Sequence, residues 1–411
     1  MNLLKGVQVR NFWGHHDISI DFYSDVNFII GINGSGKTTL VNLIVASLKG
    51  DLEELLKIDF DAIQLKLRGI GTRRQPVINI VKEGFTISYD IKDSSKSDSI
   101  NFTFDILEDT RFTFARRESF RKTRSYLSDE LSRYIELSWL SVNRAKYDPN
   151  RDSREKIISG IDPRLEQLSN DLVRYFSFIS KKVGERVDHF QKIVFLSLLF
   201  KKDKPENLLR ISAEQQRKAL EGIFQQFSVT KKDDLDTRLD SHVIGVNKAK
   251  EKLIEGTGLK FQEASILANA ERIDHIVNEW NKHLDDKKLI EEPKENFLRI
   301  INSMMQRKKF SINLHNELVI TTQSGKSLNL NDLSSGEKQL LIVLGEALLQ
   351  EKKNCIYFAD EPEISLHVKW QESLVEHLRS INPNAQIIFA THSPDVVSIF
   401  NDKVFDMEKL F

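Results

Sequence analysis

The feature that most constrains the fold is a glycine-rich segment near the amino terminus. An apolar run at residues 26–30 leads directly into the sequence Gly-Ile-Asn-Gly-Ser-Gly-Lys-Thr at residues 31–38, and a helical pattern continues from there to residue 48. The glycines let the backbone curl so that successive N–H groups face one point, and the start of the helix adds the positive end of its dipole. Strand, loop and helix in this order, with this spacing, predict a phosphate-binding loop in an α/β fold.

The polar residues of this loop have separate expected roles. Lys37 is expected to reach the β- and γ-phosphates of ATP, and Thr38 is expected to ligate Mg²⁺ through its hydroxyl. A glycine-rich turn without a ligand is the alternative, but such a turn does not require the strand before it and the helix after it. The residues predicted to bind ATP here are Asn33, Gly34, Ser35, Gly36, Lys37, Thr38 and Thr39.

A second motif lies near the carboxyl terminus, where residues 354–359 form an apolar run that ends in Asp360 and Glu361. Asp360 is predicted to be a metal ligand that holds the hydration shell of Mg²⁺, and Glu361 is predicted to orient and polarise the attacking water. A strand followed by acidic residues is often only a strand end, and the phosphate-binding loop is what favours the catalytic interpretation. Cys355, on the same run, is interpreted as a small buried hydrophobe.

Two further segments accompany this motif. Residues 333–339, Leu-Ser-Ser-Gly-Glu-Lys-Gln, open an apolar helix. The unpaired N–H groups of a helix start suit a γ-phosphate, although an ordinary helix cap explains the segment equally well when it is taken alone. His392 follows the apolar run at residues 387–390 in the sequence Thr-His-Ser-Pro. A lone histidine after a strand is more often structural, so both assignments depend on the other motifs.

In this order and spacing, the motifs resemble the ABC ATPase heads of the SMC, RecF and RecN group, over roughly the first 45 and the last 90 residues. The resemblance implies an α/β head, with a P-loop core and an antiparallel β subdomain, that forms a homodimer or higher homo-oligomer around ATP. It also implies that Ser334, Ser335 and Gly336 contact ATP held by a second subunit, and that His392 contacts the γ-phosphate and the attacking water. The predicted cofactors are ATP and Mg²⁺, and the predicted catalytic residues are Lys37, Glu361 and His392.

Three details of the resemblance stay open. Residues 364–367 resemble the segment that crosses the dimer interface, and residues 10–12 resemble the opening strand near the nucleotide. A helix cap and a hydrophobic edge strand explain these two segments nearly as well. The glutamine that normally links the γ-phosphate to the inserted arm has several candidate equivalents: Gln64, Gln75 and the pair Asn143-Arg144.

Helical periodicity dominates the middle of the chain, and no strict heptad repeat persists there. A compact helical insertion is therefore expected, rather than a long coiled coil. It divides the chain into an N-terminal half of the head at residues 1–150, the insertion at residues 151–307 and a C-terminal half of the head at residues 308–411.

Composition disfavours several classes of protein. The 60 basic and 60 acidic residues cancel, so no overall positive field attracts nucleic acid or an anionic membrane, although a local basic patch stays open. Cys355 is the single cysteine and cannot form an intrachain disulfide. The chain contains no apolar run of about 18 residues, and its start lacks the apolar core of a signal peptide. We therefore expect a cytoplasmic protein without membrane contact. Ser335 and Glu337, which replace the Gly and Gln of transporter signatures, also disfavour a transporter.

Two functions are weighed for such a head. The chain resembles the stand-alone ATPase subunits of anti-phage defence systems such as PARIS and Septu, which implies a sensor or scaffold that controls a separate nuclease or toxin effector and responds to a phage-derived trigger. From a compact insertion and a chain that ends soon after His392, we expect the nuclease to be a separate protein rather than a fused domain. The alternative is a DNA-repair or DNA-maintenance ATPase that clamps duplex DNA in the RecF manner. The neutral charge balance favours the defence role, and an ATP-binding switch with little turnover is a third hypothesis.

Overall fold

The computed structural model describes residues 1–94, 98–106, 114–141, 161–199, 211–226 and 232–411, and it divides into two compact units. The first, which we call the head unit, contains Met1–Tyr175 and Pro293–Phe411; the second, the helical unit, contains Phe176–Glu292. The predicted α/β head with a helical insertion is confirmed. The two units meet inside two helices, at residues 175–176 and 292–293. The predicted domain boundaries at residues 150 and 307 stay a prediction.

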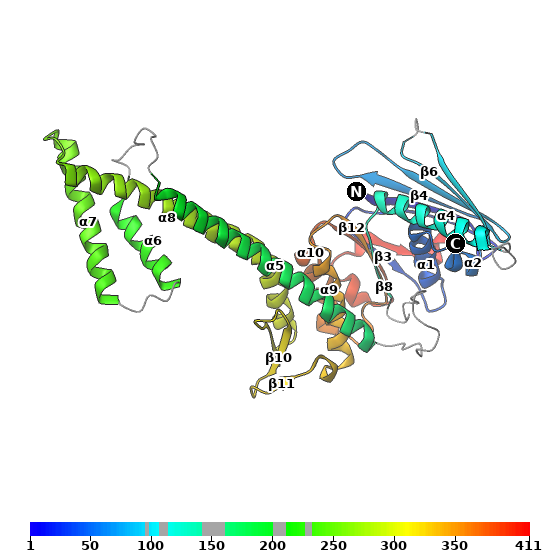
Figure 1. Cartoon of the computed structure of the whole chain (residues 1–411). Coiled ribbons are helices and arrows are strands. Elements are labelled where there is room, and N and C mark those ends of the chain that lie inside the picture. The colour runs from blue at the N-terminus through cyan, green and yellow to red at the C-terminus, as the bar shows by residue number, and fades with distance from the viewer. Residues whose placement is uncertain (95–97, 107–113, 142–160, 200–210, 227–231) are drawn as a thin grey trace. The chain divides into compact units, whose positions relative to one another are not determined.

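A five-stranded parallel sheet carries the motifs of the head unit (Figure 1). Its inner strands are almost entirely buried, as expected for a parallel sheet covered on both faces. Asp360 lies opposite Ala390 in one neighbouring strand and Ser141 in the other, so the carboxyl ends of these strands meet at one edge. In spatial order the strands are β14 (Val404–Asp406), β3 (Val26–Ile30), β13 (Ala385–Ala390), β12 (Cys355–Asp360) and β8 (Leu137–Ser141).

Helices and short turns connect these strands. The helices are α1 (Lys37–Lys49), α9 (Ser335–Leu349), α10 (Val368–Ile381), α11 (Pro394–Val397) and α12 (Met407–Leu410), with 3-10 turns η2 (Leu330–Asp332) and η3 (Asn401–Lys403). The helix α1 begins directly after the glycine-rich loop and ends at Gly50, whose left-handed backbone stops the helix.

A six-stranded antiparallel sheet forms the second layer of the head unit. Its strands alternate buried and exposed residues because only one face packs on the core. One hydrophobic core joins this sheet to α1 and to the parallel sheet, with Leu65, Ile44 and Phe358 fully buried in it. In spatial order the strands are β2 (His16–Asp21), β1 (Asn2–Phe12), β4 (Ala62–Gly69), β5 (Val77–Glu83), β6 (Thr86–Lys92) and β7 (Ile100–Asp105), and the helices α2 (Leu52–Lys57) and α4 (Phe114–Tyr134) also contribute to this core.

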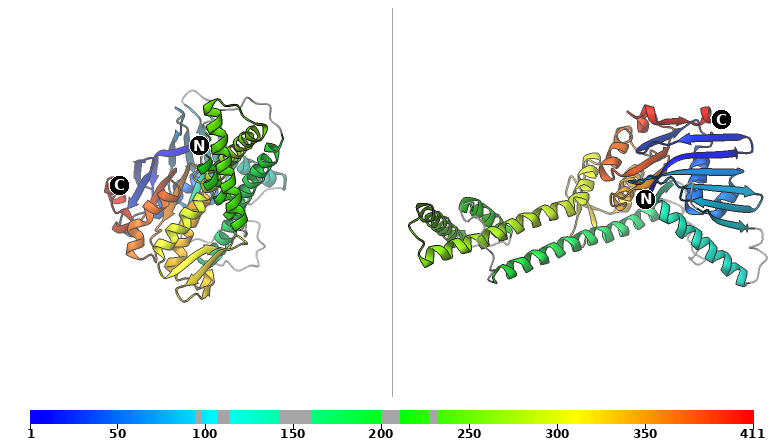
Figure 2. Two further views of the ribbon diagram at one scale, coloured as in Figure 1. Left: turned by 90° about the vertical axis from the view of Figure 1, so that its left-hand side faces the viewer. Right: turned by 90° about the horizontal axis from the view of Figure 1, so that it is seen from above.

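The helical unit is built from parts of two long helices and from two shorter ones. The helices are α5 (Ile161–Ser197), α6 (Ala213–Gln226), α7 (Lys232–Glu255) and α8 (Phe261–Met304). In this unit α5 and α8 lie side by side (Figure 2), where the rings of Phe190 and Trp280 meet edge to face at 5.0 Å between centroids. The helix α5 runs through Gly184 without a break. A glycine in open space weakens a helix by only about 1 kcal/mol and does not end it.

A small antiparallel sheet follows α8 in the head unit. Its strands are β9 (Lys308–Ile312), β10 (Leu318–Thr322) and β11 (Ser327–Leu328), with β10 in the middle. Among the described helices, none has both the length and the apolar character that a bilayer crossing requires.

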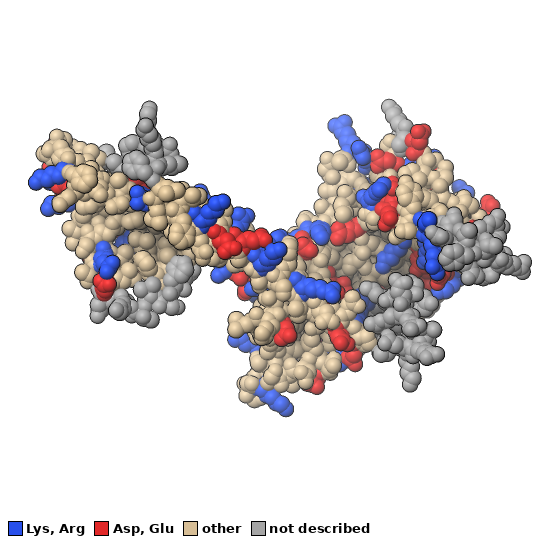
Figure 3. Space-filling model, viewed as in Figure 1, with Lys and Arg blue, Asp and Glu red and all other residues tan. Residues whose placement is uncertain are grey.

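Charged side chains of both signs are distributed over the described residues on the face shown in Figure 3. Some of them form exposed ion pairs, such as Arg124 with Glu53 at 3.6 Å and Arg74 with Asp93 at 3.3 Å. Exposed pairs of this kind contribute only about 0–1 kcal/mol to stability. Their effect is therefore on the surface potential, where positive and negative groups offset each other.

Candidate functional site

The glycine-rich loop has the backbone that the sequence pattern predicts. Gly34 and Gly36 adopt left-handed conformations with φ of 85° and 91°, which other residues adopt only with strain. Gly36 is also the residue that precedes α1, and a Cβ atom there would lie 2.8 Å from Cη2 of Trp13. Gly34 faces open space, since a Cβ atom there would meet nothing within 4 Å. The loop thus packs against the Trp13 ring at Gly36, whereas no side chain or backbone of the described residues covers it at Gly34.

Lys37 is held within this loop. Its side chain is buried, and the ammonium Nζ donates hydrogen bonds to the carbonyl oxygens of Gly31 at 2.8 Å and Ile32 at 3.0 Å. A buried ammonium needs such partners because it has lost its water. The Ser35 hydroxyl, also buried, has no hydrogen-bond partner among the described residues. The loop therefore presents a positive charge and an unsatisfied hydroxyl, which a phosphate group would suit.

Thr38 and Asp360 lie together although 322 positions separate them in the sequence. The Thr38 hydroxyl Oγ1 donates to Asp360 Oδ1 at 3.0 Å. Burial raises the pKa of Asp360, and the charges of Glu361 and Glu363 add to that effect, while the Thr38 hydrogen bond and the charge of Lys37 oppose it. A hydroxyl and a carboxylate side by side are the hard oxygen ligands that Mg²⁺ prefers. These two residues fit the predicted metal site.

Glu361 and His392 form the next pair. Glu361 has a φ of 47°, a strained conformation for a residue with a side chain, and its N–H donates to Ala390 O at 2.8 Å. Its Oε1 lies 3.6 Å from Nδ1 of His392, whose side chain is 50% exposed. Strained backbone conformations that the surrounding structure holds in place are common at functional sites. The structure thus brings Glu361 and His392, two of the predicted catalytic residues, next to each other.

The serine–glycine segment at the start of α9 is both a helix cap and a tightly packed junction. Ser334 forms a capping box with Glu337: the Ser334 N–H donates to Glu337 Oε2 at 2.8 Å, and the Glu337 N–H donates to Ser334 Oγ at 3.4 Å. Lys308 Nζ donates to both oxygens of Glu337 at 2.5 and 2.6 Å. Ser334 and Ser335 are exposed. The cap interpretation is correct locally, and the contact with ATP of a second subunit stays a prediction.

Gly336 has a packing role in addition to its place in the helix cap. A Cβ atom at Gly336 would lie 2.2 Å from the carbonyl oxygen of Ser365, in the segment that follows β12. Such a distance is far inside normal contact, so only glycine allows α9 to approach that backbone. The start of α9 and the turn after Glu361 are therefore packed directly against each other.

Two of the candidates for the linking glutamine, Gln64 and Gln75, form hydrogen bonds within the head unit, and the linking role stays a prediction. Gln64 donates to Asn79 on the neighbouring strand at 2.8 Å, and Gln75 accepts a hydrogen bond from Lys5 at 3.3 Å. Neither contact involves the phosphate-binding loop. Asn143 and Arg144 lie outside the described residues. Glu363 is a further residue of this edge, to which no sequence motif assigned a role: its Oε1 lies 3.7 Å from His392 Nδ1. Its position two residues after Glu361 is the sequence signal that points to it.

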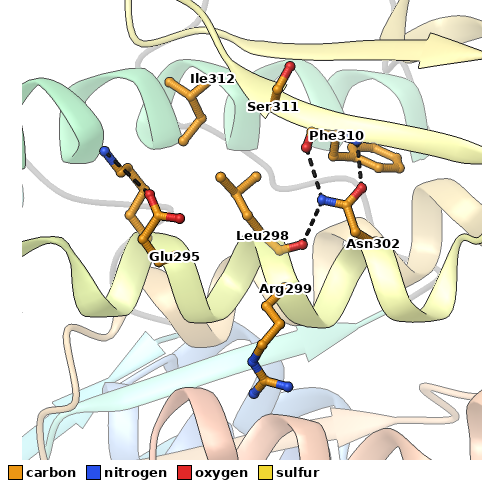
Figure 4. A pocket seen from close by; sticks show the side chains of 8 residues that line it. Glu295, Leu298, Arg299, Asn302, Phe310, Ser311 and Ile312 are labelled. Atoms are coloured by element: carbon orange, nitrogen blue, oxygen red, sulfur yellow. Dashed lines mark hydrogen bonds and ion pairs between the residues drawn. The ribbon is translucent and has the colours of Figure 1, made fainter.

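A cavity of about 340 Å³ lies elsewhere in the head unit, between the end of α8 and β9 (Figure 4). Asn302 joins its two walls, because its side-chain amide donates to Phe310 O at 2.9 Å and accepts from Phe310 N at 2.7 Å. The lining comes from residues 294–302 and 310–312, which include none of the predicted site residues. This cavity is therefore separate from the candidate site.

Comparison with known proteins places these motifs in context. The family model described as "AAA ATPase domain" matches residues 3–397. The retron Vc95 probable ATPase of Vibrio cholerae is 28% identical over 150 residues, which cover 32% of this chain and 29% of that protein. The DNA double-strand break repair Rad50 ATPase of Sulfolobus acidocaldarius is 27% identical over 105 residues, which cover 21% of this chain and 12% of that protein. The matches span less than a third of the length of these relatives.

Solved structures of SMC heads align over almost the whole chain. The Smc head domain of Pyrococcus furiosus, with an extended coiled coil and bound to the C-terminal domain of ScpA, aligns with 97% of this chain and 91% of its own. The sequence identity is 14% and the TM-score is 0.48. The SMC head domain of Thermotoga maritima aligns with 96% of this chain and 90% of its own, at 12% identity and a TM-score of 0.40.

Proposed function

Because this chain belongs to the family of AAA ATPase domains, it is an ATPase, and we propose that it hydrolyses ATP in a dimer of heads that encloses the nucleotide. The observation that carries the proposal is the pair of contacts at one edge of the parallel sheet. Thr38 bonds to Asp360 at 3.0 Å, and Glu361 lies 3.6 Å from His392. The first pair suits a metal ion, and the second pair suits a base that acts on water beside a histidine. Both pairs lie beside the phosphate-binding loop.

The residues of this edge divide the work of hydrolysis. Lys37 binds the phosphates with its ammonium. Thr38 and Asp360 would hold Mg²⁺, which would supply positive charge beside the phosphates. Glu361 orients the attacking water and accepts its proton. His392 is half exposed beside Glu361, and its proposed role is to contact the γ-phosphate. The N–H groups of the loop, from Asn33 to Thr39, complete the cradle.

The second half of each nucleotide site is proposed to come from the other subunit. Ser334 and Ser335 are exposed at the start of α9, a helix of 15 residues whose dipole favours a negative charge at this end. Gly336 anchors this helix start to the turn after Glu361. Residues 334–336, which are proposed to contact the partner's ATP, are therefore packed against the turn that follows Glu361 in the same subunit.

A test of the shared site uses two variants that should fail separately and recover together. Lys37→Ala should abolish ATP binding, and Ser334→Arg should place a bulky cation where the partner's γ-phosphate is expected. Each variant alone should lose ATPase activity. Mixed in equal amounts, they form heterodimers with one site that contains an intact Lys37 and an intact Ser334, so the mixture should exceed the sum of the separate activities. Wild-type turnover by Ser334→Arg alone would show that Ser334 does not face nucleotide.

For the biological role, we propose the sensor or scaffold subunit of an anti-phage defence system, which controls a separate nuclease or toxin in response to a phage component. The resemblance of the motifs to stand-alone defence ATPases supports this role, and the retron ATPase is a relative that shares a 150-residue segment. Expression together with the products of neighbouring genes, followed by purification, should yield a complex with an effector. Purification of the ATPase alone from such cells would count against the role.

A DNA clamp of the RecF type is the second candidate, favoured by the similarity to the Rad50 repair ATPase. Duplex DNA selects a stripe of positive charge, and binding then weakens steeply with salt. On the described face in Figure 3 the two signs are interspersed. ATP-dependent binding of a labelled duplex with a steep salt dependence, in the absence of any effector, would favour this alternative over the defence role.

A further inference from the structure

Glu363 is a buried carboxylate at the active edge of the parallel sheet. Its side chain is 4% exposed, and its Oε2 atom has no hydrogen-bond partner among the described residues. Its Oε1 atom accepts hydrogen bonds from the Thr391 hydroxyl and, at 3.3 Å, from the backbone N–H of His392. An enclosed carboxylate with one oxygen unpaired is costly compared with an apolar side chain of the same size. Such a cost indicates a task for this group.

The geometry around His392 points to that task. The ring atom Nδ1 lies 3.7 Å from Glu363 Oε1 and 3.6 Å from Glu361 Oε1. Two carboxylates on the same side of an imidazole favour a proton on the nitrogen that faces them. The other ring nitrogen, Nε2, is then the acceptor. A carboxylate that sets the orientation and tautomer of a histidine is a recurring device in catalytic sites.

The backbone around His392 is held on both sides. The N–H of Thr391 donates to Ile29 O at 3.1 Å, and the N–H of Ser393 donates to the Thr391 hydroxyl at 3.0 Å. The Ser393 hydroxyl donates to Gln371 on α10 at 2.7 Å. Glu363 connects this segment to the turn after β12, whose Leu366 N–H donates to Glu363 O at 2.9 Å. The imidazole is thus a half-exposed ring on a fixed backbone, and Glu363 is the buried group that contacts both.

We propose that Glu363 is a positioning residue for hydrolysis: it holds the His392 backbone and directs Nδ1 toward the carboxylates, so that Nε2 is presented to the phosphate side of the site. The inference rests on the proposed role of His392 in ATP hydrolysis. Glu361 and Glu363 then have different tasks although they are two residues apart. Glu361, more exposed than Glu363, acts on water, whereas Glu363 acts through the histidine.

The first experiment is Glu363→Gln, a change that preserves size and one acceptor oxygen while it removes the negative charge. Loss of a group that orients a catalytic side chain typically lowers activity by about 10- to 100-fold. The kcat for ATP should fall by that factor, while the Kd for ATP and the thermal midpoint stay at the wild-type values. Glu372→Gln, at an exposed glutamate on α10, is the matched control and should leave kcat unchanged. Wild-type kcat in Glu363→Gln would overturn the proposal.

A double-mutant cycle with His392→Gln separates positioning from a general structural effect, because groups that act as a unit are not additive. In the His392→Gln background, Glu363→Gln should lower single-turnover hydrolysis by less than twofold. Additive losses would show that Glu363 acts independently of His392 and would overturn the proposal. If Glu363→Gln does not fold, Thr391→Val, which removes the hydroxyl bound to Glu363, replaces it in the cycle under the same two criteria.

The same assay distinguishes this inference from the proposed function. Glu361→Gln and His392→Gln should each lose hydrolysis if the site assignment is correct. If both are impaired and Glu363→Gln is not, only the positioning role fails. If both hydrolyse ATP at the wild-type rate, the assignment of the site itself fails, and the positioning role fails with it.

Discussion

Gly336→Ala is the substitution whose effect the structure determines most directly. An added Cβ atom would lie 2.2 Å from the Ser365 carbonyl oxygen and 3.2 Å from its carbonyl carbon. A carbon–oxygen contact normally begins near about 3.3 Å, so about 1 Å of movement is required between two backbone segments. Overpacking of a closed site costs about 1–3 kcal/mol, and the backbone obstacle puts this site at the upper end. The higher helix propensity of alanine returns about 1 kcal/mol.

The expected net loss in the free energy of unfolding is therefore about 2 kcal/mol, accompanied by loss of ATPase activity because the start of α9 moves away from the turn after Glu361. Guanidinium denaturation followed by circular dichroism, with ATPase assays, measures both effects. Gly345→Ala is the matched control on the same helix. Its Cβ atom would meet the two Cδ atoms of Leu168 at 2.9 Å, and a leucine side chain can change rotamer. That variant should stay within about 1 kcal/mol of the wild type. Equal stability of the two variants, with full activity in Gly336→Ala, would refute the reasoning.

Three further outcomes are expected. Lys37→Ala should lose ATP binding in isothermal titration because it removes the charge held in the loop, and wild-type affinity would contradict the P-loop assignment. Burial raises the pKa of Glu337, but hydrogen bonds from Lys308 and Ser334 outweigh burial and hold that pKa below its ordinary value of 4.5. A lowered folded-state pKa contributes stability above 4.5 that is lost as pH falls further, so Glu337→Gln should flatten the acid limb of the stability curve; an unchanged acid limb would argue against the ion pair. Burial, together with the nearby charge of Glu136, raises the pKa of the Cys355 thiol to about 12. A thiol reagent at neutral pH should therefore react with Cys355 only as the protein unfolds. Fast labelling of the native protein would show instead that Cys355 is accessible.

The sequence was sufficient to predict the local elements that carry the candidate site residues. The apolar run at residues 26–30, the glycines and the following helix are contiguous, so strand, loop and helix could be read from spacing alone. The acids after residues 354–359 and the cap at Ser334 were predictable for the same reason. The α/β fold class was predicted from this strand, loop and helix and from the resemblance of the motifs to known ATPase heads. Such signals are short-range because backbone conformation depends mainly on neighbouring residues.

Tertiary structure decided which of these elements meet. Thr38 and Asp360 become neighbours only because β12 lies next to β13, and β13 next to β3, an order that no local pattern encodes. The proposed role of Glu363 could not be predicted from the sequence, because Thr391, whose hydroxyl donates to it, follows a different strand, β13. The need for glycine at residue 336 depends likewise on the backbone of Ser365. Contacts between distant residues follow from sheet order and packing, which the whole chain determines together, so they are visible only in the folded molecule.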